Sequence, residues 1–250
     1  MSGRVTSLVV LAAGQGKRMR SSLPKVLHQV CGRPMLLHVL DAAFSVEAER
    51  VVVVLGHGHE QVRPYLPPDC AWVLQKEQLG TGHALLAAAD LLPPGEALVL
   101  PGDVPLITGE VLRDLVEEHR SLGASATVLT MELSDPTGYG RIIRDVEGYV
   151  VDIVEQGDAT PEQLAVCEVN SGIYVLPVPT VLEVLREVGR DNSQGEIYLT
   201  DAIAGLQKRG LKVAARRLAD ATLALGVNSP EELAVAEEIM ARRLMATRGV

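Results

Sequence analysis

The sequence is poor in aromatic residues and in cysteine. Its 250 residues include one Phe, one Trp and five Tyr, although 47% are hydrophobic, so a buried core must be built from Val, Leu, Ile and Ala. The three cysteines, Cys31, Cys70 and Cys167, are widely spaced and odd in number. Such spacing excludes a disulfide framework and a CxxC metal site, and is typical of free thiols in a reducing cytosol.

Positive charge is also in short supply. The chain has 23 Lys and Arg against 32 Asp and Glu, which gives a formal net charge of −9. This balance disfavours non-specific binding to nucleic acid, because such binding needs a basic face that displaces counterions. Phosphate ligands stay possible, since a few well-placed cations or a metal ion can hold one locally.

Long hydrophobic runs are missing as well. The longest, 8–13 and 51–55, are too short to cross a bilayer. The first residues run straight into a strand-like segment, without the charged and apolar regions of a secretory signal. We therefore expect a cytoplasmic protein with no membrane partner. The composition is that of a folded globular chain.

Short apolar runs alternate with helix-period segments through the first half of the chain. The apolar spacing predicts a helix whose first residue is Pro34, a helix capped by Thr81 that runs to residue 91, and a helix around 112–116. Strands separated by such helices indicate an α/β fold with a doubly wound, mostly parallel, Rossmann-like sheet. Five runs predict its strands, at 8–11, 51–55, 71–74, 97–100 and 126–129.

The pattern changes beyond residue 130. Segments 139–143 and 149–154 flank a turn-forming Asp-Val-Glu-Gly sequence and predict a hairpin. We therefore expect a small β insertion at 131–170, over the C-terminal edge of the sheet. A later helix is expected over 197–209.

The end of the chain predicts one more helix. Ser229-Pro230-Glu231-Glu232 has the spacing of a capping box. The expected organisation is one domain over residues 1–228 and a C-terminal helix over 229–250.

The most informative segment is the glycine-rich loop Leu11–Met19, which follows the first strand. A turn there places backbone N–H groups at the carboxyl edge of the sheet, where open α/β folds bind ligands. The loop lacks the Walker A pattern, and Met19 holds the third glycine position of a dinucleotide fingerprint. An ordinary strand-to-helix turn is the alternative. Lys17, Arg18 and Lys25 beside the loop favour a polyphosphate ligand instead.

A carboxylate follows a second strand. Asp103 comes after the run 97–100, so it is expected at a carboxyl strand end over the ligand crevice. A carboxylate in that place suits Mg²⁺, which takes one or two protein oxygens and fills its other positions with water and phosphate. The alternative is a turn-forming Asp.

Seven segments of the chain, in order, resemble nucleotide-sugar pyrophosphorylases. The first is the glycine loop together with Leu23-Pro24-Lys25. As a set, they resemble the uridyltransferase domain of the bifunctional bacterial enzymes that make UDP-N-acetylglucosamine. The other six are 75–84, 102–106, 135–142, 168–172, 194–201 and 226–228.

The resemblance implies a sheet of the nucleotide-diphospho-sugar transferase type and a Mg²⁺-dependent reaction. UTP and N-acetylglucosamine 1-phosphate would give UDP-N-acetylglucosamine and pyrophosphate, for cell-wall precursor synthesis. A sugar-phosphate oxygen attacks the α-phosphorus, so the enzyme needs to align and screen two polyanions and supplies no nucleophile. The resemblance implies that Arg18 binds the β and γ phosphates of UTP. It also implies that Lys25 binds the sugar phosphate and the new bridging oxygen.

The same resemblance assigns the binding residues. Asp103 and Asn228 are the implied metal ligands. The amide of Gln75 can offer a donor and an acceptor to a uracil edge. The implied nucleotide-binding residues are Leu11, Ala12, Ala13, Gly14, Gly16, Gln75, Gly80 and Thr81, and the implied sugar-binding residues are Gly140, Glu155 and Asn170.

Each assignment has a structural alternative. Arg18 and Lys25 could be solvated surface charges, and Glu155 could be a solvent-facing acid at a strand end. Asn228 could form a turn or cap a helix, and Thr81 could be a helix cap. Pro101 stands where the family commonly has Tyr, which leaves the sugar specificity open. The rival functions are another nucleotidyltransferase on the same fold, and a UDP-sugar-binding module without turnover.

The hexapeptide repeats of a left-handed β-helix are not found in this sequence. In the bifunctional relatives such a domain carries the acetyltransferase and holds a trimer. We therefore expect no acetyl transfer and a monomer.

Overall fold

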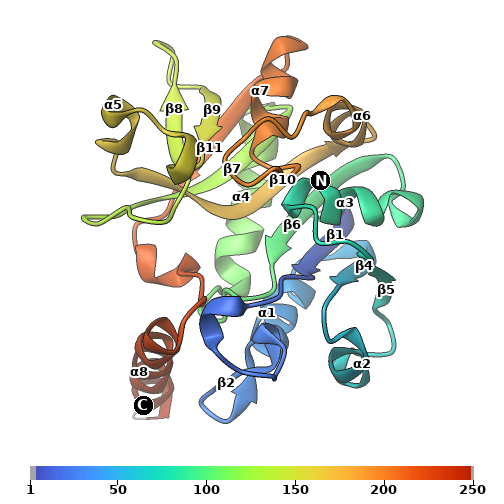
Figure 1. The fold of residues 1–250 in the computed structure, drawn as a ribbon, viewed down its shortest axis with the longest axis vertical. Helices are drawn as coiled ribbons and strands as arrows, with labels where there is room; N and C mark the ends of the chain where they lie inside the picture. The colour runs from blue at the N-terminus through green and yellow to red at the C-terminus, as the bar shows by residue number, and fades with distance from the viewer. Residues whose placement is uncertain (1–3, 249–250) are drawn as a thin grey trace.

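Nine strands of the computed structural model, which describes residues 4–248, form one mixed sheet (Figure 1). Their order is β11-β7-β10-β6-β1-β4-β5, and β8 and β9 form a hairpin beside β10. All five strands predicted for the first half are present. The strands are β1 (Val5–Ala12), β4 (Ala48–Leu55), β5 (Ala71–Leu74), β6 (Gly95–Pro101), β7 (Ala126–Glu132), β8 (Arg141–Arg144), β9 (Val150–Val154), β10 (Glu168–Val178) and β11 (Val213–Arg217).

Along the seven-strand order from β11 to β5, four of the six neighbouring pairs run parallel, as predicted. β1 pairs in parallel with β4 and β6, β4 with β5, and β7 with β11, whereas β10 runs antiparallel to β6 and β7. The chain moves from β1 to β4 and β5 on one side and then crosses to β6 on the other. This reversal leaves a crevice at the carboxyl ends of β1 and β6. Because β10 is reversed, its first residues lie at the same edge.

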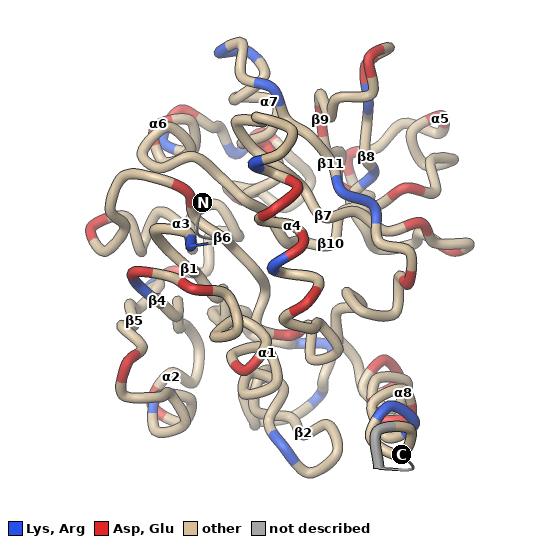
Figure 2. The backbone as a smooth tube through the Cα atoms, turned by 180° about the vertical axis from the view of Figure 1, so that it is seen from behind, with Lys and Arg blue, Asp and Glu red and all other residues tan. Residues whose placement is uncertain are grey.

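Helices cover both faces of the sheet. Two of them, α1 (Met35–Phe44) and α4 (Gly109–Ser121), pack on the face that is seen from behind (Figure 2). The other face is covered by α3 (Thr81–Ala87), α6 (Thr180–Glu187) and α7 (Asp201–Lys208).

The core between these layers is aliphatic, as predicted. Side chains alternate along β1, so that Leu8 and Val10 pack on the side of α1 and α4, whereas Val9 packs on the other side. All three are fully buried. Apart from Tyr174 and Met35, the largest fully buried side chains are Leu.

The predicted hairpin is present, as β8 and β9. It joins the main sheet where Val169 of β10 lies opposite Arg141 of β8, so the insertion extends the sheet instead of lying over its edge. The shorter elements are β2 (Gln29–Val30), β3 (Arg33–Pro34), α2 (His59–Val62) and α5 (Pro161–Leu164), and the last helix is α8 (Pro230–Arg248).

Two predicted helix starts are wrong. Pro34 does not begin α1, because it belongs to β3 and the helix starts one residue later. Thr81 does not cap α3: it is the first helical residue, and its hydroxyl accepts a hydrogen bond from the Leu199 amide at 3.0 Å. The helix itself stops at Ala87, and a separate 3-10 turn covers Ala89–Leu91.

The helix expected from residue 197 begins only at Asp201. Residues 197–199 are bonded to the loop before α3 instead, since the Ile197 amide donates to the Leu79 carbonyl at 2.8 Å. This contact between distant segments overrides the local helical pattern.

α8 begins where the capping pattern predicts, but its bonds differ from a capping box. The Ser229 hydroxyl accepts from the Glu232 amide at 3.2 Å, whereas the Glu232 carboxylate accepts from the Asn228 amide at 2.5 Å. The expected domain at 1–228 and the expected helix at 229–250 include residues 1–3 and 249–250, which lie outside the described residues. Among the helices that are described, none is long and apolar enough to span a membrane.

Candidate active site

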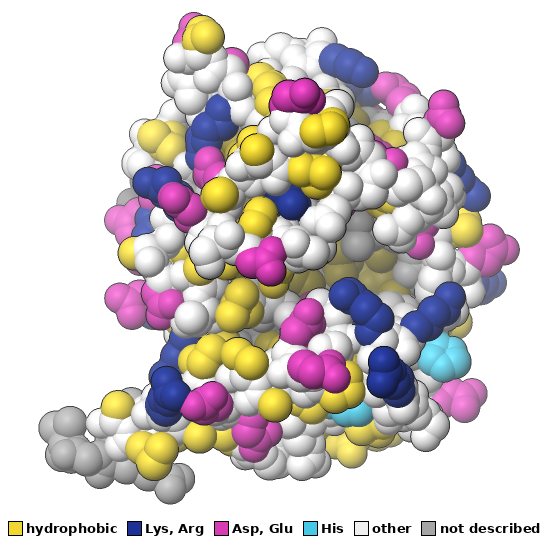
Figure 3. Space-filling view, turned by 60° about the vertical axis from the view of Figure 1, so that its left-hand side comes forward, with side chains coloured by type: hydrophobic (Ala, Val, Ile, Leu, Met, Phe, Trp, Pro, Cys, Tyr) yellow, Lys and Arg dark blue, Asp and Glu magenta, His cyan; other side chains and the backbone are white. Residues whose placement is uncertain are grey.

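A cleft of about 620 Å³ opens at the carboxyl edge of β1, β5 and β6. Seen from the side, the surface is hollowed between its upper and lower halves, and Lys and Arg side chains gather along the lower rim (Figure 3). Every residue predicted for the site lines this cleft except Gly140. They are Leu11, Ala12, Ala13, Gly14, Gly16, Arg18, Lys25, Gln75, Gly80, Thr81, Asp103, Glu155, Asn170 and Asn228.

The glycine loop presents hydrogen-bond donors to the cleft. The backbone amides of Gly14, Gln15 and Gly16 have no hydrogen-bond partner within residues 4–248. Arg18 is exposed, and its guanidinium forms no hydrogen bond or ion pair with any described residue. The loop therefore offers N–H groups and a cation that no described residue occupies, and such groups are suited to holding a polyphosphate.

Gly16 is required at its position. Its φ is +62°, and a Cβ there would lie 2.6 Å from the Cβ of Lys25. The left-handed conformation and this close approach exclude a larger residue. Gly14 is different, because a Cβ at that position would meet nothing within 4 Å.

Gln75 lies at the end of β5 and is only 3% exposed. Its amide nitrogen donates to the Gly80 carbonyl at 3.0 Å and lies 3.0 Å from Nδ1 of His83. Gly80 has a φ of +104°, and a Cβ there would lie 2.4 Å from the Ile197 carbonyl oxygen. The base-side loop is thus held between Gln75 and the segment before α7.

Two of the three residues predicted to bind the sugar, Glu155 and Asn170, line the cleft. Glu155 accepts a hydrogen bond from the Thr200 hydroxyl at 3.0 Å. Asn170 donates to the Tyr174 hydroxyl at 2.6 Å and accepts from the Gly172 amide at 2.9 Å. Thr200 and Tyr174 also line the cleft, and sequence reasoning missed both.

Gly140 lies behind this pair and does not line the cleft. Its carbonyl accepts from the Asn170 amide at 2.9 Å. A Cβ on Gly140 would lie 3.0 Å from Ile153 and 3.5 Å from the Glu155 carboxylate. The structure therefore makes Gly140 a support for Glu155 and Asn170.

Burial raises the pKa of the Glu155 carboxyl, and the charges of Asp201 and Asp158 add to the rise. The hydrogen bond from Thr200 opposes it. A desolvated carboxylate with one hydroxyl donor retains lone pairs for other donors, such as sugar hydroxyls.

Asp103 and Asn228 lie together, and the ammonium group of Lys25 bridges them. It forms an ion pair with the Asp103 carboxylate and donates to Asn228 Oδ1 at 3.0 Å. Lys25 and Asp103 are 14% and 15% exposed. The Val227 amide donates to the Asp103 carbonyl at 2.9 Å and so fixes the two segments side by side. A cation therefore already occupies the position between the two predicted metal ligands.

Pro101, the departure from the family pattern, lies on the cleft wall. A Cβ on Gly172 would lie 3.2 Å from Pro101 Cγ. The proline ring therefore packs beside the bulge of β10, where the strand register shifts between Asn170 and Ile173.

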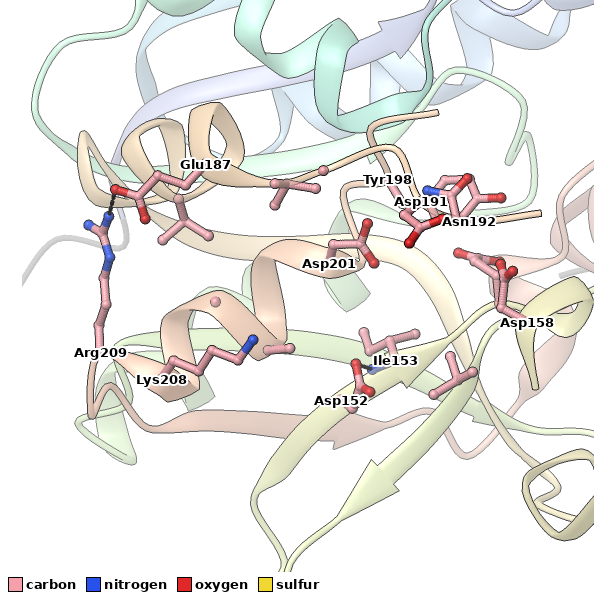
Figure 4. A pocket seen from close by; sticks show the side chains of 17 residues that line it. Asp152, Ile153, Asp158, Glu187, Asp191, Asn192, Tyr198, Asp201, Lys208 and Arg209 are labelled. Carbon is pink, nitrogen blue, oxygen red and sulfur yellow. Dashed lines mark hydrogen bonds and ion pairs between the residues drawn. The ribbon is translucent and has the colours of Figure 1, made fainter. Parts of the chain in front are cut away.

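A second cavity of about 600 Å³ lies between β9, α6 and α7 and shares only Glu155 with the cleft (Figure 4). Asp152 and Asp201 lie near its middle, Asp158 lies toward one side, and an ion pair between Glu187 and Arg209 lies at the other side. The other predicted site residues do not line it.

Residues 8–194 match the MobA-like NTP transferase domain. The chain belongs to the MobA-like NTP transferase family. Within this family, it is 49% identical over 239 residues to "Bifunctional protein GlmU" of Lactobacillus delbrueckii subsp. bulgaricus, a match that covers 95% of this chain and 52% of that protein. The protein of the same name from Caldanaerobacter subterraneus subsp. tengcongensis is 48% identical over 237 residues, 94% of this chain and 52% of that protein. The chain spans about half the length of the curated relatives that it matches.

A solved structure shows that this NTP transferase has a known fold. UDP-glucose pyrophosphorylase complexed with UDP-glucose superposes with a TM-score of 0.79 at 20% identity, covering 96% of this chain and 99% of that one. The predicted nucleotide-diphospho-sugar transferase type of sheet is thereby confirmed.

Proposed function

We propose that this chain transfers the uridylyl group of UTP to N-acetylglucosamine 1-phosphate, releasing pyrophosphate and forming UDP-N-acetylglucosamine, a cell-wall precursor. The observation that carries the proposal is the arrangement of the cleft. The loop amides and Arg18, which have no partner among the described residues, line one cleft together with Gln75, Glu155 and Asn170. The identity of 48–49% to proteins named GlmU supports it.

The reaction needs no protein nucleophile. An oxygen of the sugar phosphate attacks the α-phosphorus, the bond from the α-phosphorus to the bridging oxygen breaks, and its electron pair leaves on pyrophosphate. The loop amides and Arg18 bind the β and γ phosphates, where negative charge builds up. Lys25 lies close enough to Gly16 to serve the incoming phosphate and the new bridging oxygen.

Asp103 and Asn228 are suited to hold Mg²⁺. Both offer oxygen ligands, and the contact of both with the compact Lys25 ammonium group supports this assignment. When bound, Mg²⁺ supplies charge neutralisation to the phosphates. Within the described residues, no group of three or more His, Cys, Asp or Glu side chains could hold a metal, so the remaining ligands would come from phosphate and water.

The sugar binds between Glu155 and Asn170 in this proposal. The carboxylate accepts from sugar hydroxyls, and the Asn170 amide retains a hydrogen for a carbonyl such as that of an acetamido group. Thr200 and Tyr174 hold the two side chains in place. We place this activity in the domain at 1–228 and in the cytoplasm.

The decisive experiment is pyrophosphate release by the purified protein, with UTP, dTTP, CTP and GTP each paired with several sugar 1-phosphates, with and without Mg²⁺. We expect release only with UTP, N-acetylglucosamine 1-phosphate and Mg²⁺ together. Preference for another sugar phosphate would support the alternative function, a nucleotidyltransferase of a different sugar phosphate, which the Pro101 departure leaves open. Tight binding of UDP-N-acetylglucosamine without release would make the chain a binding module, and equal release with every nucleotide would rule out the proposed base choice.

Gly80→Ala is expected to raise KM for UTP by about tenfold or more, because the left-handed φ and the contact with the Ile197 carbonyl force the base-side loop to move. Initial rates at varied UTP measure the effect. Gly123→Ala is the matched control, because Gly123 also has a positive φ, of +57°, but has open space around it. A normal KM in Gly80→Ala would remove this loop from nucleotide binding.

A further inference from the structure

We infer that His83 sets the base preference of the cleft by fixing the orientation of the Gln75 amide. The inference rests on the proposed function, because it concerns the nucleotide that enters this cleft. His83 is the third residue of α3 and is partly buried. It is not among the residues that line the cleft, so it acts through Gln75 and is a positioning residue.

The Gln75 side chain uses both of its amide hydrogens within the protein. A carbonyl only accepts, so one hydrogen goes to the Gly80 oxygen at 3.0 Å. The other points to Nδ1 of His83, also at 3.0 Å. Nδ1 then accepts, which places the ring proton of the neutral imidazole on Nε2.

The Gly80 carbonyl opposes the other amide orientation, because a flipped amide would set the Gln75 oxygen against another acceptor. In the observed orientation, the contact with His83 Nδ1 holds the amide against rotation. The backbone of Gln75 is also fixed. Its backbone N–H donates to the Leu55 carbonyl at 2.8 Å, and its backbone carbonyl accepts from the side-chain amide of Gln78 at 3.2 Å.

The Gln75 side-chain oxygen is the atom left over. It has no hydrogen-bond partner among the residues that the structure describes, and Gln75 lines the cleft. A fixed acceptor of this kind suits a ring N–H, as at N3 of uracil. It repels the bare N3 lone pair of cytosine, so the selection works by exclusion as well as by attraction.

Removing the imidazole should loosen this choice. In His83→Ala the amide loses one of the two contacts that set its orientation, and its nitrogen can turn toward the cleft. We expect the ratio of kcat/KM for UTP over CTP to fall about tenfold, which corresponds to one hydrogen bond of discrimination. We expect kcat at saturating UTP to stay within about twofold, because the phosphate contacts are untouched.

The variants His83→Ala and His83→Asn test the inference together. An Asn carbonyl oxygen can lie near the place of Nδ1 and accept from Gln75, so His83→Asn should keep most of the UTP preference. His57→Ala is the control, because His57 is exposed and forms no hydrogen bond with Gln75. Initial rates of pyrophosphate release with UTP and with CTP give the ratios, and thermal melting confirms that each variant is folded.

The outcomes separate this inference from the proposed function. A reduced ratio in His83→Ala with a retained ratio in His83→Asn supports it. An unchanged ratio in His83→Ala, or an equal loss in both variants, overturns it while leaving the proposed function intact. A wild-type chain that uses UTP and CTP equally well overturns the proposed base choice, and the inference falls with it.

Discussion

Replacing Asp103 with Asn should reduce pyrophosphate release by about a thousandfold at any Mg²⁺ concentration. The substitution keeps the shape of the side chain and removes the negative charge next to Asn228 and Lys25. Without that charge the pair holds a divalent cation poorly, and the repulsion between the two phosphate substrates is no longer screened. Losses of this size are typical when a main electrostatic contact to a transition state is removed.

The measurement is the initial rate against Mg²⁺ concentration, with thermal melting of each variant. Asp41→Asn is the matched control, because Asp41 forms an exposed ion pair with Arg33 outside the cleft, and exposed pairs contribute little. Its rate should stay within about twofold of the unmodified chain. A folded Asp103→Asn variant with a normal rate would remove Asp103 from the proposed reaction.

The glycine loop could be identified from the sequence because its chemistry is local. The strand before it, the unpaired amides and the cations of Arg18 and Lys25 all lie within fifteen residues of Leu11. The strands could also be predicted from the sequence, because buried parallel strands have continuous apolar runs. Asp103 could be placed in the same way, because a residue that follows an apolar parallel strand lies at the carboxyl edge of the sheet.

The supporting residues could not be identified in the same way. Thr200 reaches Glu155 across 45 positions of the sequence, and no spacing rule connects them. Thr81 has the sequence of a helix cap, but a tertiary bond with Leu199 takes its hydroxyl. Tyr174 has the pattern of a core strand residue, and only the register shift in β10 brings its hydroxyl to Asn170.

Lys25 shows a further limit of sequence reasoning. The resemblance implies that Lys25 binds the sugar phosphate, whereas in the structure it bonds the two predicted metal ligands. Both positions would fit one reaction if Asp103 and Asn228 held a divalent cation, because the Lys25 ammonium group would then be free of both side chains. Its side chain would lie beside the glycine loop, where its stem already packs against Gly16.

Lys25→Met is therefore expected to have two effects of opposite sign. Turnover should fall by about a hundredfold or more, because a cation beside the reacting phosphates is lost. Binding of Mn²⁺ to the protein without nucleotide should become about five- to tenfold tighter, because the metal no longer competes with an ion pair. Methionine keeps much of the length of the lysine stem, so the packing on Gly16 is largely preserved.

Titration calorimetry with Mn²⁺ and initial rates of pyrophosphate release measure the two effects, and Lys212→Met is the control for loss of a lysine charge outside the cleft. A fall in both turnover and metal binding would show that Lys25 helps to build the metal site and does not compete for it. A fall in turnover with unchanged metal binding would place Asp103 and Asn228 outside the metal site. A fall in turnover together with tighter Mn²⁺ binding is the result expected if the Lys25 ammonium group competes with the metal and also binds the phosphates.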